Sequence, residues 1–157
     1  MTQTTQKPGQ PPGLCLIADA RDNARWLARC AEALDATSAA TVIVAAPEGT
    51  AIDAKAAGAL VTMAQQKGVA ALLQDDWRTA RALAADGVHV TARADVDEAY
   101  RAARAGLDPG AIVGVDAGRS RHDAMMLGEA GADYVAFSPF ESSEEAEDSH
   151  LDLVAWW

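Results

Sequence analysis

Short apolar runs alternate with stretches of helical spacing along most of the chain. The runs cover residues 13–19, 40–46, 69–74, 87–91, 111–117 and 134–138 and predict strands, while apolar residues spaced three and four apart predict helices over 23–34, 52–66, 77–85, 96–105 and 120–130. Strands that alternate with helices in this way predict a parallel sheet with crossover helices. Because the runs are apolar at nearly every position, we expect both faces of the sheet to be covered.

Glycines stand between several predicted helices and the strands that follow. They occur in the pairs Lys67-Gly68, Asp86-Gly87 and Ala130-Gly131, each directly before an apolar run. Glycine at the end of a helix adopts the left-handed conformation that turns the chain back. We therefore expect a left-handed cap at each of the three glycines.

The order of elements favours an α/β fold of the TIM-barrel-like (β/α) type. No G-x-G-x-x-G follows the first strand and no Walker lysine loop is present, which disfavours a nucleotide-binding fold. An eight-stranded barrel usually needs roughly 200 residues or more, so 157 residues predict a barrel truncated to about six units. We expect one domain over 13–157, a flexible segment over 1–12 that is not a signal peptide, and the start of a helix over 151–157.

The net charge of the chain limits the classes of molecule that it is expected to bind. The formal net charge is −10, from 23 acids against 13 Lys and Arg. With no basic patch, we expect no nucleic acid and no membrane as partners, and a cytoplasmic location. Cys15 and Cys30 are interpreted as reduced packing residues, with a disulfide as the alternative.

Three stretches together carry a family resemblance. They are VAALLQDDWRTARALAADGVHV (69–90), AIVGVDAGRSRHDAMMLGEAGADYVAFSPF (111–140) and the closing DLVAWW (152–157). They resemble the thiamine phosphate synthase/TenI family of (β/α)8 barrels over about residues 38 to 157. The resemblance implies an enzyme that joins a pyrimidine diphosphate to a thiazole phosphate with Mg²⁺ and releases pyrophosphate. Cations around the leaving diphosphate stabilise its growing negative charge.

Several of the family's charged motifs are altered in this chain. The second strand of the family carries Q-L-R-x-K, but the corresponding 42–46 is VIVAA. The family's G-Q-E-D, which supplies a metal-binding aspartate, is replaced by TARA (91–94), with Asp95 one residue late. The family's Ser-x-His corresponds to 116–118, which reads DAG. Its threonine-rich phosphate segment ending in lysine corresponds to 141–145, which reads ESSEE.

The family's Asn-Asp pair is partly kept, as Gln74-Asp75. The resemblance therefore implies Asp75 as a metal ligand, with Mg²⁺ as the possible cofactor. It implies Gln74, Asp116 and Ser138 as substrate-binding residues for a small-molecule ligand at the carboxyl ends of the strands, where barrel sites lie. No catalytic residue is assigned.

These residues also have simpler interpretations. Asp76 is expected to cap the helix that begins at Trp77. Asp75 then belongs either to a solvated loop or to a metal or polar ligand site. Asp116 is expected to pair with Arg119 or Arg93, although two convergent carboxylates can also hold a hard cation.

His89 is expected to be a hydrogen-bonded core histidine, with a ligand role as the alternative. The carboxylates of Asp19, Asp75 and Asp116 are expected to lie near one another, and the acidic run 141–148 to form a solvated loop.

The sequence leaves three functions open. The first is a catalytically degenerate member of the family related to thiamine biosynthesis. The second is a divergent active synthase that uses Asp75 and Asp116. The third is a non-enzymatic binding or regulatory protein. A homodimer is expected in each case, because the apolar runs 13–19 and 134–140 would be open sheet edges, and the terminal Trp156 and Trp157 need apolar cover.

Overall fold

A computed structural model of the chain describes residues 13–138 and 149–157. The segments 1–12 and 139–148 lie outside the described residues. The expected flexible start of the chain and the expected solvated acidic loop fall in these two segments, so neither expectation is addressed by the described fold.

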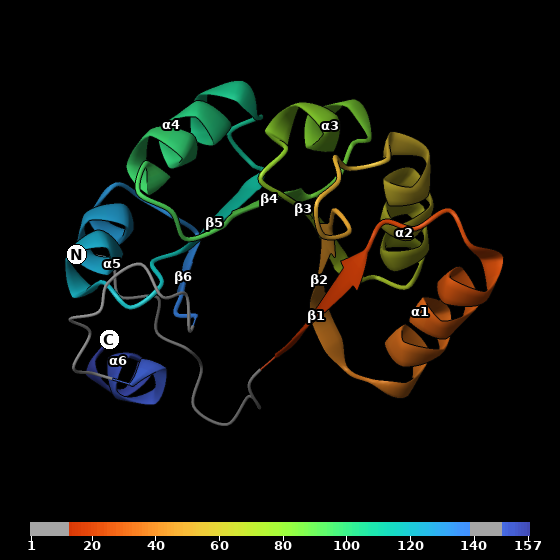
Figure 1. Cartoon of the computed structure of the whole chain (residues 1–157), viewed down its shortest axis with the longest axis horizontal. Helices are drawn as coiled ribbons and strands as arrows, with labels where there is room; N and C mark the ends of the chain where they lie inside the picture. Colours follow the sequence, from red (N-terminus) through yellow and green to blue (C-terminus); the bar gives the residue numbers. More distant parts are fainter. Residues whose placement is uncertain (1–12, 139–148) are drawn as a thin grey trace.

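The described chain forms one parallel sheet with helices between consecutive strands. The strands are β1 (Leu14–Asp19), β2 (Ala39–Ala45), β3 (Ala70–Gln74), β4 (Gly87–Val90), β5 (Ile112–Asp116) and β6 (Tyr134–Ala136), and they lie in sequence order. The helices are α1 (Ala24–Ala36), α2 (Ala54–Gln66), α3 (Trp77–Ala82), α4 (Val96–Gly106), α5 (Arg121–Glu129) and α6 (His150–Trp156). Figure 1 shows the sheet curled into an arc, with β1 and β6 at its two ends. The arrangement is a half-barrel of the TIM-barrel-like type, as expected from the sequence.

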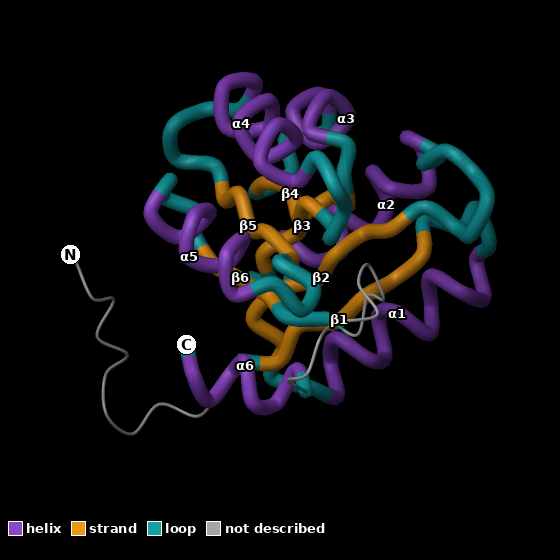
Figure 2. Tube along the Cα trace, turned by 60° about the vertical axis from the view of Figure 1, so that its left-hand side comes forward, coloured by secondary structure: helices purple, strands orange, loops and turns teal. Residues whose placement is uncertain are grey.

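The core lies between the sheet and the helices on its convex side. Outward-facing residues of β2 and β3, such as Val44 and Leu73, pack with Leu60 of α2 in one cluster. Val88 and Val113 pack with residues of α4 and α5 in a second cluster. The views in Figures 1 and 2 agree that α1 to α5 follow the outside of the curled sheet.

The expectation of a sheet covered on both faces is therefore wrong for the concave side at β1. Ile17 alternates with the outward-facing Leu16 and Ala18, and 71% of its surface is exposed. Within the described sheet β1 is an end strand, and an apolar run alone does not distinguish an end strand from one that is covered on both faces.

Short polar side chains define the starts of the helices. Asp53, Asp76, Ser120 and Ser149 each accept a hydrogen bond from a backbone N–H in the first turn of the following helix, as does Asn23 at α1. Such caps each stabilise a helix by about 1 kcal/mol. The expected role of Asp76 is confirmed, since its carboxylate accepts from both the N–H and the hydroxyl of Thr79.

Two of the three predicted glycine caps are confirmed. Gly68 and Gly131 have φ values of 71° and 93°. The prediction for Gly87 is wrong, because this residue lies inside β4 and Ala84 takes the left-handed conformation after α3, with φ 52°. A Cβ on Gly87 would lie 1.8 Å from the carbonyl oxygen of Ile112, so glycine is needed there for close approach of β4 and β5.

Candidate functional site on the concave face

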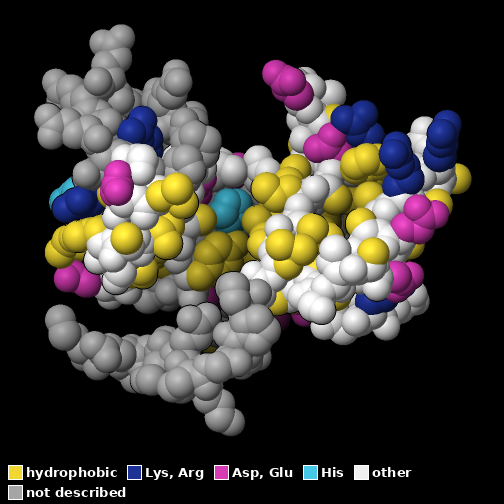
Figure 3. Space-filling view, turned by 90° about the horizontal axis from the view of Figure 1, so that it is seen from below, with side chains coloured by type: hydrophobic (Ala, Val, Ile, Leu, Met, Phe, Trp, Pro, Cys, Tyr) yellow, Lys and Arg dark blue, Asp and Glu magenta, His cyan; other side chains and the backbone are white. Residues whose placement is uncertain are grey.

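The concave face gathers polar side chains toward the carboxyl ends of the strands. Gln74 pairs in register with His89, His89 with Gly114, and Gly114 with Tyr134. The residues that alternate with them pack outward against the helices. Viewed from the open side, a histidine and hydrophobic side chains line the middle of the hollow, and the coloured Lys and Arg side chains lie at its periphery (Figure 3).

His89 and Tyr134 form a hydrogen-bonded pair across β5. The Nδ1 atom of His89 lies 2.8 Å from the hydroxyl of Tyr134, and the two rings stack with centroids 5.8 Å apart and planes 11° apart. The tyrosine ring crosses Gly114, where a Cβ would lie 2.0 Å from the ring. The glycine in β5 is therefore what lets the two side chains meet.

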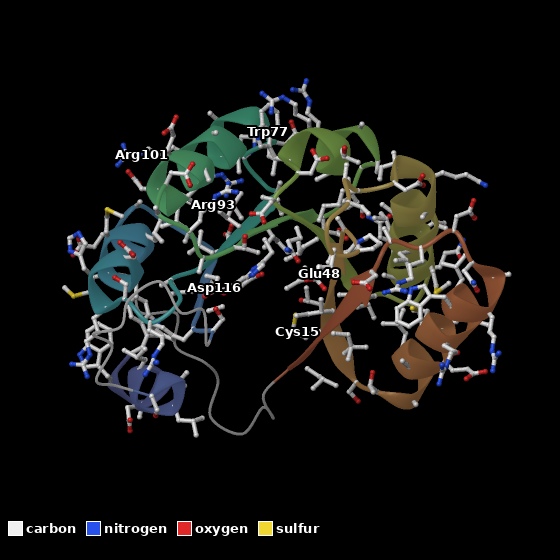
Figure 4. All side chains as sticks on the ribbon, viewed as in Figure 1. Cys15, Glu48, Trp77, Arg93, Arg101 and Asp116 are labelled. Carbon is white, nitrogen blue, oxygen red and sulfur yellow. The ribbon has the colours of Figure 1, made fainter. Side chains whose placement is uncertain are left out.

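Both members of this pair are held neutral at pH 7. Burial lowers the pKa of the His89 imidazole, and the negative charges of Asp116 and Asp75 only partly offset that effect. Burial raises the pKa of the Tyr134 phenol, and the negative charges of a Cys15 thiolate and of the Asp116 carboxylate act in the same direction. The pKa of the Cys15 thiol is itself raised by burial, so at pH 7 only Asp116 carries that charge. Figure 4 shows Cys15 of β1 and Asp116 of β5 on opposite sides of the opening.

Asp116 is buried at the end of β5, with 7% of its surface exposed. Its Oδ1 accepts a hydrogen bond of 2.7 Å from the N–H of Gly118, which has a φ of 58°. This bond orders the turn after β5. Arg93 is one of the two arginines expected to pair with Asp116. That expectation is wrong, because Arg93 forms ion pairs with Asp75 and Asp95 instead.

Asp75 joins the end of β3 to the residue after β4. Its backbone has a φ of 57°, and its N–H donates to the carbonyl of His89. One carboxylate oxygen accepts from the N–H of Thr91 at 2.9 Å and the other from the Thr91 hydroxyl. The guanidinium of Arg93 lies 3.7 Å from the carboxylate. Asp75 therefore has local structural partners on both of its oxygens.

The donor set around Asp75 does not fit the Mg²⁺ that the family resemblance implies. Mg²⁺ in proteins is held by one or two carboxylates together with water and substrate oxygens. Here the carboxylate is already bonded to Thr91 and faces a guanidinium. The described residues also contain no group of three His, Cys, Asp or Glu placed to hold a metal. The carboxylate of Asp75 is instead held by groups of the protein itself, Thr91 and Arg93.

The other sequence-predicted residues are placed as follows. Gln74 is half-buried beside His89, and Ser138 is half-buried two residues after β6. Asp19 accepts from Arg21 at 2.6 Å and its charge acts on the Cys30 thiol, whose pKa is raised mainly by burial. Asp75 and Asp116 both act on His89, whereas Asp19 has a different set of partners.

Two cavities lie outside the concave face, between the sheet and its helices. One, of about 170 Å³, is lined by Asp75, Arg93 and the inner sides of α3 and α4. The other, of about 390 Å³, lies beneath α1 and is lined mainly by apolar residues that include Trp26 and Leu34. Arg93 thus contacts the space beneath α4, as its position in Figure 4 also indicates.

Sequence reasoning missed Tyr134, Gly114 and Thr91. A glycine within an apolar strand signals close approach of another group, so Gly114 was the available clue. Nothing in the local sequence connects Tyr134 with His89 or Thr91 with Asp75, because each pair is formed by separate strands.

Comparison with models of protein families shows which family the chain belongs to. The model of the thiamine monophosphate synthase family, TMP-TENI, matches residues 14–157. The chain belongs to this family. Membership in the family relates it to thiamine biosynthesis and agrees with the resemblance carried by residues 69–90 and 111–140.

Individual relatives carry the same description. A thiamine-phosphate synthase of Hyphomonas neptunium is 45% identical over 104 residues, which are 64% of this chain and 46% of that protein. A thiamine-phosphate synthase of Xylella fastidiosa is 36% identical over 140 residues, 85% of this chain and 56% of that protein. The chain therefore spans about half the length of the curated relatives it matches.

This chain is also similar in fold to a solved structure. Thiamine phosphate pyrophosphorylase from Pyrococcus furiosus superposes with a TM-score of 0.61 over 80% of this chain and 59% of that one. The two sequences are 22% identical, so this likeness shows the fold alone. Among the described residues, no helix is long and apolar enough to cross a bilayer.

Proposed function

We propose that this chain is a catalytically degenerate member of the thiamine monophosphate synthase family that binds a small heteroaromatic ligand on its concave face. The observation that carries the proposal is the combination of a hydrogen-bonded and stacked His89–Tyr134 pair on that face with described strands that contain no Lys or Arg. Binding without synthesis is what these two features together support.

The lack of cations argues against synthesis. None of the six described strands contains a Lys or Arg. The inward-facing positions of β2, where the family resemblance leads us to expect cations, are Thr41, Ile43 and Ala45. Donors and cations aimed at developing charge each contribute on the order of a hundredfold to rate. A diphosphate leaving group on this face would lack that stabilisation.

The neutral pair supports recognition of an aromatic ring instead. His89 and Tyr134 offer stacked apolar surface together with polar atoms that donate and accept hydrogen bonds. Gln74 lies beside His89 and adds amide donors and an acceptor. The buried carboxylate of Asp116 disfavours a phosphorylated ligand and favours an uncharged or cationic one.

A synthase assay tests the catalytic half of this proposal. The purified chain is supplied with the pyrimidine diphosphate, the thiazole phosphate and Mg²⁺, and thiamine phosphate is measured. No product above the enzyme-free reaction is expected. Turnover that is abolished by Asp116→Asn would support the divergent active synthase instead and would overturn the proposal.

A second copy of the chain is the partner that we propose. The sheet has β1 at one end and β6 at the other in the described topology. Large apolar side chains are exposed near both ends: Ile17 is 71% exposed on β1, and Leu151 and Val154 are 72% and 60% exposed on α6. A strand edge with exposed apolar neighbours favours association, and a symmetric dimer is the commonest result.

A further inference from the structure

Arg93 lies between two carboxylates at the end of the sheet. Its NH1 atom is 3.7 Å from Asp75 and its Nε atom is 3.4 Å from Asp95. The side chain of Arg93 is 38% exposed and that of Asp75 is 27% exposed, so solvent screens this group only in part. The guanidinium thus neutralises the acid that the family resemblance assigns to a metal.

The remaining contacts of Asp75 also restrict its use as a metal ligand. Both of its oxygens accept hydrogen bonds from Thr91, one from the backbone and one from the hydroxyl. A divalent cation at this carboxylate would have to compete with those bonds and would lie close to a fixed positive charge. Like charges a few ångströms apart repel even at high effective dielectric constant.

We propose that Arg93 takes the place of a divalent cation at Asp75, so that this end of the sheet carries its own positive charge and binds no metal there. Asp75 then acts as a positioning residue that connects the end of β3 with Thr91. This inference concerns Asp75 and Arg93 alone and does not depend on whether the proposed ligand binds the concave face.

The chain contains a matched control for this proposal. Arg101 pairs with Asp97 on the surface of α4, at 2.9 Å, and 69% of its side chain is exposed. Figure 4 shows Arg101 on α4 and Arg93 apart from it, nearer the sheet. Arg93→Ala and Arg101→Ala change the net charge equally, so general attraction of cations to the acidic protein is the same in both.

Mn²⁺ is the probe, with free Mn²⁺ measured by electron paramagnetic resonance during titration of the whole chain without organic ligand. We expect wild type and Asp75→Asn to give the same curve. We expect Arg93→Ala to bind Mn²⁺ roughly fivefold more tightly than Arg101→Ala, because the repulsion is removed. The gain should disappear in the Arg93→Ala/Asp75→Asn double variant.

Two outcomes would overturn the proposal. One is Mn²⁺ binding by wild type that Asp75→Asn abolishes, since metal and guanidinium would then coexist. The other is an Arg93→Ala curve that matches the Arg101→Ala curve. Circular dichroism confirms that each variant is folded, and Arg93→Gln, which keeps much of the side-chain length, replaces Arg93→Ala in the same comparison if the latter does not fold.

Discussion

The imidazole Nδ1 of His89 lies 2.8 Å from the hydroxyl of Tyr134, although 45 residues separate them in the sequence. Parallel pairing of β4, β5 and β6 brings the two side chains to the same face of the sheet. Gly114 between them leaves the space that the tyrosine ring fills. The candidate site therefore depends on three adjacent strands and on one residue without a side chain.

The first prediction concerns that residue. Gly114→Ala places a Cβ 2.0 Å from the Tyr134 ring and must displace it. We expect the free energy of unfolding to fall by about 1–3 kcal/mol, as for other overpacked cores. Urea unfolding followed by circular dichroism measures the change. In Gly110→Ala, a Cβ meets nothing within 4 Å, so this variant is the control and should unfold nearly as wild type does.

The cause of that loss can be separated from the general cost of substitution in a strand. In a Tyr134→Leu background the ring is absent, so adding Gly114→Ala should cost much less than in wild type. Equal costs in the two backgrounds would show that Gly114 does not act by admitting the tyrosine ring.

The second prediction concerns pH. Burial holds the pKa of His89 below its ordinary value of 6.5. As pH falls through 6.5, the unfolded chain takes up a proton at this residue more readily than the folded chain does, so the folded state loses stability. His89→Gln should therefore lose less stability than wild type between pH 7 and pH 5.5. Urea titrations of both proteins at the two pH values measure this loss. An equal loss of stability in wild type and in His89→Gln would contradict the burial of His89.

The third prediction concerns the link from Asp75 to Thr91. Asp75→Asn keeps an oxygen acceptor and tolerates the φ of 57°, whereas Asp75→Ala loses both the hydrogen bonds and that tolerance. We expect Asp75→Ala to be less stable than Asp75→Asn by about 1–3 kcal/mol. Thermal and urea unfolding measure this difference. Equal stability of the two variants would show that the bonds to Thr91 contribute little.

The fourth prediction concerns assembly. Sedimentation over a concentration series is expected to give a dimer, and Ile17→Glu is expected to weaken it because Ile17 is the most exposed large apolar residue on a strand. Thr62→Glu, on the exposed side of α2, adds the same charge as a control. A strictly monomeric wild type would end the proposal.

The terminal tryptophans give a further arm of that experiment. Trp157 packs against Gly128 of α5, yet 57% of its surface is exposed, and 38% of Trp156 is exposed. If changing both to serine leaves a dimer intact, the interface lies at the strand edges and not at α6. Loss of the dimer in a variant that remains folded would place the interface at α6.

The sequence predicted the fold well because the fold depends on local patterns. Apolar runs and helical spacing located all six strands within a few residues, and Asp76 was correctly identified as a cap. The error at Gly87 arose because glycine serves both as a helix cap and where strands approach closely. The sequence does not distinguish these two uses.

The site was less predictable because it depends on pairing between strands. His89 was expected to be a hydrogen-bonded core residue, and that is confirmed, but its partner Tyr134 was not foreseen. Arg93 was expected near Asp116, whereas it reaches Asp75 and Asp95. A long side chain at the end of a sheet can reach several acids, and only the geometry of the loop decides which one.

Binding of a heteroaromatic ring without synthesis can be measured by calorimetric titration with the pyrimidine precursor. The unphosphorylated pyrimidine and its diphosphate are each titrated into the whole chain, with Mg²⁺ and with a chelator. We predict that the unphosphorylated ring binds, that Mg²⁺ does not change its affinity, and that His89→Ala abolishes binding. We also predict that the diphosphate binds more weakly than the ring alone. Tight binding of the diphosphate that requires Mg²⁺ would contradict the proposed function.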